Sequence, residues 1–290
     1  MVTLSVVIPV YNEEKRIGVC LESLLAQTRP ADEIVIVDNG STDSSGEVID
    51  RYRADHPEIR VITQTTPGLQ AARRTGFDAA TSQFIARTDA DSVVATDWVQ
   101  RILDFFDDET GREFAAVSGL TLPSDGPARD ILHKVALVGM GKRKDGGEYQ
   151  GIAGPNCALR AEAWNRAKSH LVDRVDTWED LDLALALNEC GLKKYFLPTM
   201  LVDTSMRQSR HSPWENRRYL TGGIRTARAH GDSAAVRMMY VDLPFRIVTF
   251  TLLWLVFRPW DDEKRNWRPW RLVTPLERER ELSTTNRETK

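Results

Sequence analysis

Short apolar runs alternate with stretches of helical period over the first 120 residues. The apolar runs are rich in β-branched residues and have the length of strands: LSVVIPV (4–10), EIVIVD (33–38), IRVIT (59–63), QFIART (83–88) and FAAVSGL (114–120). Between the first two, apolar residues from Ile17 to Leu25 recur at helical spacing, which predicts an amphipathic helix with Asn12 as its N-cap. Ser44 and Glu47 have the spacing of a capping box, which predicts a second helix near Ser44.

The alternation predicts an α/β fold whose sheet is mostly parallel. Parallel strands joined by helices cross over right-handed, and such sheets bind ligands at the carboxyl ends of their strands. Polar residues follow three of the predicted strands: Tyr11 with Asn12, the loop DNGSTD (38–43), and TDADS (88–92). We therefore expect one crevice to collect these three groups. After residue 120, turn-rich stretches interrupt the pattern.

Asp89 and Asp91 pose a question of charge, because two carboxylates one residue apart repel each other unless a cation lies between them. Hard oxygen ligands of this kind suit Mg²⁺ or Mn²⁺, which would hold a diphosphate. A solvated strand end is the plain structural alternative. The stretch also fits the D-x-D-x-[TV] pattern of haloacid-dehalogenase-type phosphatases, with Asp89 as nucleophile, although that pattern normally belongs to the first strand.

Two further charged groups have both a functional and a structural interpretation. Arg73 begins a predicted helix after the third strand, where a guanidinium could reach a phosphate or simply be solvated. Glu179 and Asp180 lie in the first turn of a predicted helix in TWEDLDLALALNECG (177–191), where carboxylates complement the helix dipole. A general base at this position is the sharper alternative, because a helix start can present a carboxylate into a cleft.

The second half of the chain adds a turn and a basic cluster. Asn156 lies in a Gly-Pro-Asn turn that could line a site or form a plain hairpin. Arg207, Arg210 and His211 belong to a basic cluster that could meet phosphate or lie on a charged helix face. His211 is also a candidate metal ligand, although a lone histidine is more often not one.

Composition narrows the class of protein. A chain of 290 residues is long enough for one catalytic domain with an appendage. The net charge of −3 and the pI near 6.0 argue against nucleic acid as a partner. The cysteines lack the spacing of a disulfide framework or a zinc site, and the N-terminus does not resemble a signal peptide, so we expect a reducing, cytoplasmic location.

The C-terminal region contains an apolar run, IVTFTLLWLVF (247–257), of eleven residues. Spanning a bilayer takes about 20 residues, so we expect this run not to span. Tryptophans and basic residues interleave around and after it, which suits a membrane interface. A core or dimer helix is an equal alternative, so 240–270 is a candidate for peripheral membrane contact or a homodimer interface.

The motifs in series carry more information than any one alone. VVIPVYNEE, IVIVDNGSTD, GLQAARRTG, TDADS, GPNCALR and WEDLDL, in this order over roughly residues 3–200, resemble the inverting family 2 glycosyltransferases with the GT-A fold. The resemblance implies a Rossmann-like, mostly parallel nucleotide-binding sheet flanked by helices, with a helical C-terminal appendage. It also implies transfer of a sugar from a UDP- or GDP-sugar to a hydroxyl of a glycan or lipid-linked acceptor, with inversion and a divalent metal.

The resemblance assigns roles to individual residues. Asp180 would be the catalytic base, and Asp91 would ligate Mn²⁺ or Mg²⁺, with Asp89 and His211 as further candidate ligands. The residues expected to border the nucleotide are Pro9, Tyr11, Glu13, Asp38, Arg73 and Asp89. Beyond the resemblance, the turn at Asn156 and the basic cluster lead us to expect contacts to the acceptor or a phosphate from Asn156, Arg207 and Arg210, together with Glu179, the neighbour of Asp180; the candidacy of His211 as a metal ligand rests on that cluster too.

The resemblance also implies a domain plan. A catalytic domain over 1–235 would divide into a nucleotide-sugar half (1–120) and an acceptor half (121–235), followed by an apolar, tryptophan-rich segment and charged tail (236–290). The Gln-x-x-Arg-Trp motif of processive synthases is absent, which favours addition of single sugars in glycan, cell-envelope or glycolipid synthesis, at the inner face of the plasma membrane if the C-terminal segment meets it. A phosphatase and a non-catalytic nucleotide-sugar-binding protein are the alternatives.

Overall fold

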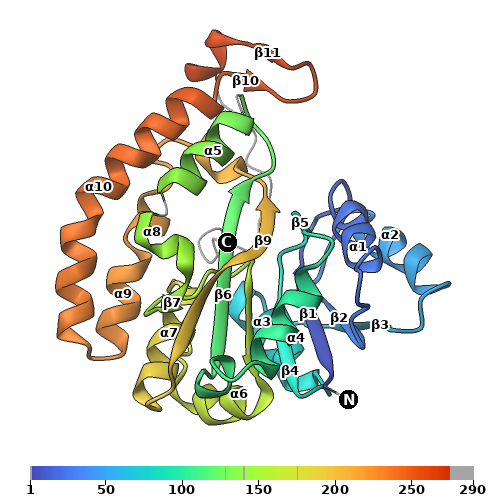
Figure 1. The fold of residues 1–290 in the computed structure, drawn as a ribbon. Coiled ribbons are helices and arrows are strands. Elements are labelled where there is room, and N and C mark those ends of the chain that lie inside the picture. The colour runs from blue at the N-terminus through green and yellow to red at the C-terminus, as the bar shows by residue number, and fades with distance from the viewer. Residues whose placement is uncertain (1, 128, 140, 175, 275–290) are drawn as a thin grey trace.

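The computed structural model describes residues 2–127, 129–139, 141–174 and 176–274, and one mixed sheet of nine strands organises them (Figure 1). Its strands are β1 (Leu4–Val10), β2 (Glu33–Asp38), β3 (Ile59–Thr63), β4 (Phe84–Arg87), β5 (Ser92–Val94), β6 (Ala116–Pro123), β7 (Gly147–Glu148), β8 (Cys157–Arg160) and β9 (Lys194–Thr204). The order across the sheet is β3-β2-β1-β4-β8-β6-β9-β5, and β7 pairs with β9. β1 to β4 pair in parallel, as the alternating pattern predicts.

Helices cover both faces of the sheet. They are α1 (Ile17–Leu25), α2 (Ser45–Arg53), α3 (Leu69–Ala79), α4 (Trp98–Asp107), α5 (Arg129–Gly139), α6 (Ala161–Ala167), α7 (Glu179–Glu189), α8 (Arg217–Leu220), α9 (Gly222–Ala229) and α10 (Ser233–Phe257). Leu4, Val6 and Ile8 of β1 pack in one core with α1, α2 and α4, whereas Val7 packs in a second core with α3, α6 and α7. Burial on both faces explains why Val6, Val7 and Ile8 are consecutive apolar residues in β1.

The predicted helix caps are wrong, although both helices exist. Asn12 adopts a left-handed backbone conformation with φ 55°, and its side-chain oxygen accepts from the Thr42 amide at 2.8 Å instead of capping α1. Ser44 occupies the N-cap position of α2 but makes no side-chain cap bond. Its amide donates to Glu14 at 3.0 Å, so the loop after β1 and the loop after β2 bind each other.

The second half of the chain completes the sheet with antiparallel pairs. β8 pairs antiparallel with β4, and β5, directly after the Asp89–Asp91 stretch, pairs antiparallel with the end of β9. Ser92 therefore lies opposite Thr204 in the ladder, and their hydroxyls are 3.0 Å apart. This pairing brings the short 3-10 helix η4 (Arg207–Arg210) beside the end of β4.

The apolar run 247–257 is only the second half of α10, which is one helix of 25 residues. By length and composition α10 could cross a membrane, since its most apolar window has a mean hydropathy of 1.5. The sequence predicted that the eleven apolar residues are too few to span a bilayer, but the helix that contains them is long enough to do so. α10 begins close to the predicted domain boundary at 235/236, which itself stays a prediction. A short hairpin, β10 (Trp260–Asp261) with β11 (Asn266–Trp267), and the 3-10 helix η5 (Pro269–Leu272) follow.

Gly76 of α3 is where this helix approaches the sheet most tightly. A Cβ at this position would lie 2.3 Å from Cγ1 of Val7 and 3.0 Å from Cγ2 of Val37. We expect Gly76→Ala to lower the free energy of unfolding by about 1–3 kcal/mol, because overpacking a filled core costs that much. Gly46→Ala is the matched control, since Gly46 lies in α2 with nothing within 4 Å of an added Cβ.

Gly46→Ala should leave stability unchanged or raise it by up to about 1 kcal/mol. Urea unfolding of both variants measures the difference. Equal stabilities of the two variants would contradict the tight contact between α3 and β1.

Candidate active site

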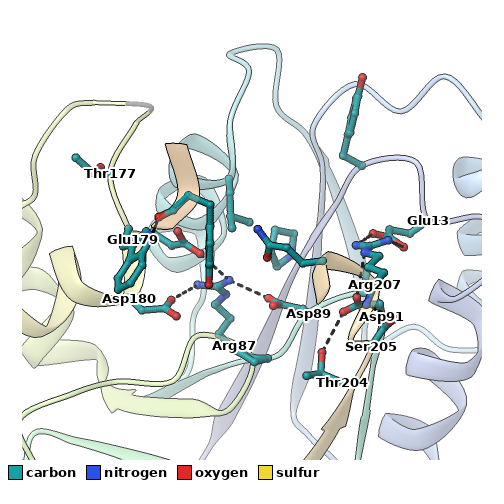
Figure 2. Close-up of a pocket in the computed structure, with 18 residues that line it drawn as sticks. Glu13, Arg87, Asp89, Asp91, Thr177, Glu179, Asp180, Thr204, Ser205 and Arg207 are labelled. Carbon is teal, nitrogen blue, oxygen red and sulfur yellow. Dashed lines mark hydrogen bonds and ion pairs between the residues drawn. The ribbon is translucent and has the colours of Figure 1, made fainter. Parts of the chain in front are cut away.

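A cleft of about 290 Å³ opens where β1 and β4 end, between η4 and the start of α7 (Figure 2). The loop after β1 supplies Tyr11 and Glu13, and the end of β4 supplies Arg87 with the two aspartates that follow it. The start of α7 supplies the opposite wall, and Ser205 and Arg207 enter from the end of β9. The lining residues are Pro9, Tyr11, Glu13, Leu69, Arg87, Asp89, Ala90, Asp91, Pro155, Thr177, Trp178, Glu179, Asp180, Thr204, Ser205, Arg207, Gln208 and Tyr219.

Arg87, the last residue of β4, is the centre of the cleft floor. Its guanidinium lies 2.8 Å from Oδ1 of Asp89, 3.4 Å from Oε1 of Glu179 and 3.3 Å from Oδ1 of Asp180. Burial alone would lower the pKa of Arg87, but these three carboxylates outweigh it and raise the pKa above its ordinary value. One buried cation therefore joins the acidic stretch after β4 to the carboxylates of α7.

Sequence reasoning did not identify Arg87. The signal was an arginine closing an otherwise apolar strand, FIAR, directly before TDADS. All four residues of β4 are buried, and a buried arginine needs carboxylate partners. The position of Arg87 could therefore have been read as the partner of Asp89.

Asp180 points into the cleft from the first turn of α7, with 35% of its side chain exposed. Its Oδ2 accepts from the amide of Gly154 at 2.9 Å, and a Cβ on Gly154 would lie 2.3 Å from Oδ1. Partial loss of hydration in the cleft, with the neighbouring Glu179 carboxylate, raises the pKa of Asp180 to about 7, against the opposing charge of Arg87. A carboxylate with a pKa near neutrality suits general base catalysis.

Asp91 and Glu13 form the acidic end of the cleft, and Arg207 lies between them. Arg207 donates to both carboxylate oxygens of Glu13, one at 3.0 Å, and its Nε lies 3.4 Å from Oδ2 of Asp91. Thr204 donates to Oδ1 of Asp91 at 3.3 Å. Burial raises the pKa of Asp91 to about 6, although Arg207 opposes the rise. This end of the cleft is thus built to bind positive charge.

The carboxylate oxygens of Asp89 and Asp91 are of the kind that bind a divalent ion, although they do not form a complete set of metal ligands. Within the described ranges, no group of three or more His, Cys, Asp or Glu residues is arranged to hold a metal. Asp89 and Asp91 nevertheless both face the cleft, and a buried carboxylate with a raised pKa gains from a nearby cation. His211 does not line the cleft, and its ring lies 3.7 Å from Glu215.

Four predicted contact residues lie outside the cleft lining. Arg73 is 1% exposed, donates to the backbone carbonyl of Glu179 and lies 3.8 Å from Asp182, so it braces the start of α7. The Asp38 carboxylate accepts from the Ser41 amide at 3.0 Å. Contacts of Arg73 and Asp38 with a nucleotide stay predictions.

Asn156 and Arg210 make structural contacts outside the cleft lining, and the contacts expected of them stay predictions. Asn156 is fully buried: its oxygen accepts from the Trp98 indole at 2.8 Å, and its nitrogen donates to two carbonyls, of Leu120 and Met200. Asn156 is not among the residues that line the cleft, and its contact with an acceptor or a phosphate stays a prediction. Arg210 pairs with Asp125 at 3.2 Å and with Asp262 of the C-terminal hairpin, away from the cleft lining.

Comparison with solved structures gives the fold family. A mannosyltransferase from Pyrobaculum calidifontis in complex with GDP-Man and Mn²⁺ superposes with a TM-score of 0.64 at 21% identity, over 86% of this chain and 73% of that one. S. aureus TarS 1-349 in complex with UDP-GlcNAc superposes with a TM-score of 0.58 at 16% identity, over 84% of this chain and 73% of that one. The α/β architecture is therefore the GT-A fold, as expected.

Comparison with curated proteins and family models agrees. The uncharacterized glycosyltransferase YibD of Escherichia coli is 42% identical over 31% of this chain and 26% of its own length. The poly(ribitol-phosphate) beta-glucosyltransferase of Bacillus spizizenii is 36% identical over 35% of this chain and 17% of its own. The match thus spans between 26% and 31% of the length of the first curated relatives. Residues 5–162 match the model of glycosyl transferase family 2, and the chain belongs to that family.

Proposed function

We propose that this protein transfers a single sugar from a nucleoside-diphosphate sugar to an acceptor hydroxyl, with inversion at the anomeric carbon. The observation that carries the proposal is the geometry of the cleft. Asp180, a carboxylate with its pKa raised to about 7, and the acidic pair Asp89 and Asp91 line the same cleft, joined through Arg87. A base and a site for a charged leaving group are the two parts that such a transfer needs.

The donor would bind where β1 and β4 end. Pro9, Tyr11 and Glu13 border that end of the cleft, and Asp38 would bond the base. Asp91, with Asp89, would hold Mn²⁺ or Mg²⁺, which when bound neutralises the charge of the departing nucleoside diphosphate. Arg207 already neutralises Glu13 and Asp91, so it is the protein cation nearest to that charge. The structural neighbours that bind GDP-Man with Mn²⁺ and UDP-GlcNAc support this class of donor.

The acceptor would enter between α7 and α8. Asp180 takes the proton of its hydroxyl, the oxygen forms a bond to the anomeric carbon, and the bond from that carbon to the diphosphate oxygen breaks on the opposite side. Arg87 stays in contact with Asp180 and keeps the ionised carboxylate in place. Trp178 and Tyr219 line this side of the cleft with aromatic surface. A glycan or lipid-linked acceptor of the cell envelope is the class that we propose.

Thermal unfolding tests the donor site directly. We would measure the midpoint with UDP, GDP or neither, each with and without Mn²⁺. A ligand at about 100 times its Kd adds about 2.7 kcal/mol to the native state, so one nucleotide with Mn²⁺ should raise the midpoint by several degrees. Asp91→Asn should lose the shift, because it removes the buried carboxylate proposed to hold the metal.

Asp50→Asn is the control variant, since Asp50 lies on α2 with 71% of its side chain exposed. It should keep the shift. If neither nucleotide moves the midpoint of the unmodified protein, with or without Mn²⁺, the donor-site proposal fails. A shift that Asp91→Asn retains in full would remove Asp91 from the metal site.

A further inference from the structure

α10 exposes apolar side chains along nearly its whole length. Only 6% of its most apolar 18-residue window is buried inside the protein. The exposed residues recur every three or four positions, which places them on one continuous stripe. They are Met238, Val241, Phe245, Val248, Leu252 and Leu255, each between 46% and 70% exposed. Soluble proteins rarely expose an apolar surface of this extent without a partner.

The stripe continues onto neighbouring elements. Phe257, at the end of α10, contacts the backbone of Gly126 just before α5, and Figure 1 shows α5 beside that end of α10. α5 has no buried residue and exposes Ile131, Val135 and Val138 by 62% or more. We call the exposed apolar residues of α5 and α10, together with Trp267 and Trp270 of the C-terminal hairpin region, the apolar face.

The opposite side of α10 is seated on the protein. Ala235 and Met239 pack in a small core with Leu185 of α7 and Ile224 of α9, and Phe257 is 1% exposed. Arg246, which bonds to Asp242 at 2.6 Å, stacks over the ring of Trp178 at 4.3 Å. A helix held in this way cannot be surrounded by lipid on all sides. It can lie in the plane of a membrane interface with its free side in the lipid.

Charge identifies the kind of surface that the apolar face fits. The chain is acidic overall, with a net charge of −3, yet basic residues outnumber acidic ones among the exposed charges of the segments that carry or adjoin the face: Lys134, Lys144, Arg217, Arg218, Lys264 and Arg265, against Asp130, Asp145, Glu215 and Glu263. Arg217 stacks over Trp214 at 4.9 Å, and Trp214 is 75% exposed. Exposed tryptophans and basic residues beside apolar surface are typical of the interface with anionic headgroups.

We propose that the apolar face docks this protein on the surface of a lipid bilayer that contains anionic headgroups, with α10 lying in the interface. A bilayer of this kind accounts for both features of the surface, because lipid covers the apolar side chains and anionic headgroups attract the basic majority around them. The proposal stands independently of catalysis.

The docked position would also place the cleft. Phe250 of α10 packs on Tyr219 with ring centroids 5.8 Å apart, and Tyr219 packs on Trp178 at 5.5 Å. Tyr219 and Trp178 both line the cleft, so α10 contacts the wall of the cleft directly through Phe250 and Tyr219. If the proposed function holds, the acceptor is therefore an amphiphile presented at the membrane surface.

Flotation of the full chain with lipid vesicles tests the docking. We expect the protein to float with vesicles of phosphatidylcholine and phosphatidylglycerol, and far less with phosphatidylcholine alone. The triple variant Phe245→Glu/Val248→Glu/Leu252→Glu should not float. Val19→Glu is the matched control, because Val19 is a 52% exposed apolar residue on α1, on the other side of the molecule (Figure 1), and it should float like the unmodified protein.

Three outcomes would overturn the proposal. They are an unmodified chain that floats with neither vesicle, a triple variant that still floats, and flotation that does not depend on phosphatidylglycerol. Sedimentation of the same samples reports on the second copy: a dimer that the triple variant disrupts, without flotation, would make the face a self-interface. A cooperative thermal unfolding transition of the triple variant shows that it folds, and the nucleotide-induced shift of that transition reports on the proposed function. It also separates failure of docking from failure of the proposed function.

Discussion

Asp180→Asn should reduce sugar transfer by about 10²- to 10⁴-fold, because general base catalysis contributes a factor of that size. Asparagine keeps the shape of the side chain and can still accept from the Gly154 amide, which lies 2.9 Å from Oδ2 of Asp180. The cleft should therefore stay intact, and the nucleotide should bind as before. Transfer to the acceptor, followed by release of the nucleoside diphosphate, and the thermal shift with nucleotide measure the two properties separately.

The pH dependence gives this prediction a second readout. Burial and the Glu179 carboxylate raise the pKa of Asp180 to about 7, so the base is protonated below that pH and ionised above it. The kcat should therefore fall about tenfold per pH unit below the pKa and level off above it. Asp50→Asn should show the same profile as the unmodified protein. Full transfer by Asp180→Asn, or a profile that is flat from pH 5 to pH 8, would assign the base to another group.

Arg87→Met should lower both transfer and stability. It removes the guanidinium that lies within 3.4 Å of the carboxylates of Asp89, Glu179 and Asp180 and leaves their charges unbalanced. Breaking a buried ion pair in this way costs about 3–5 kcal/mol, and we expect the lower end because Asp89 and Asp180 reach the water of the cleft. The pKa of Asp180 should rise further, so the pH at which kcat levels off should move upward.

Arg87→Lys separates charge from shape. Lysine keeps the positive charge but cannot bond several carboxylates at once through a planar fork. We expect it to keep the pH profile close to normal while losing part of the stability. Urea unfolding and pH–rate profiles of both variants test this. An Arg87→Met variant with an unshifted profile would show that Arg87 supports the fold without acting on the base.

The local parts of the fold could be predicted from the sequence. The strands over 4–10, 33–38 and 59–63 appear with the predicted bounds, because length and periodicity of apolar residues determine them. The apolar residues from Ile17 to Leu25 form a helix as predicted, but it begins at Ile17 and not directly after Asn12. The caps could not be predicted, since Asn12 bonds to Thr42, 30 residues away. The sequence pattern indicated too short a helix at α10, because Pro244 and the Asp242–Arg246 pair interrupt its apolar residues.

For the candidate site too, local features could be predicted and long-range contacts could not. The acidic pair at Asp89 and Asp91 could be found because both residues follow one strand, and the cleft lining includes them together with Asp180. The pairing of Arg87 with Asp89, two residues away, could have been read from the sequence, but its contacts with Glu179 and Asp180, 92 and 93 residues away, could not. The partners of Asn156 lie 36 to 58 residues away, and only the folded chain shows them.

The pairing of β5 with β9 limits how early the cleft can form while the ribosome synthesises the chain. Ser92 and Thr204 meet across 112 residues of chain, and Arg207 reaches Glu13 across 194. Contacts at such separation form late, since closing a long loop costs entropy before any contact repays it. While the ribosome is still adding residues before Thr204, Asp91 has neither its strand partner nor Arg207. A nascent chain can thus complete the sheet order β3-β2-β1-β4 and still carry no finished cleft, so function begins only when nearly the whole domain has been made.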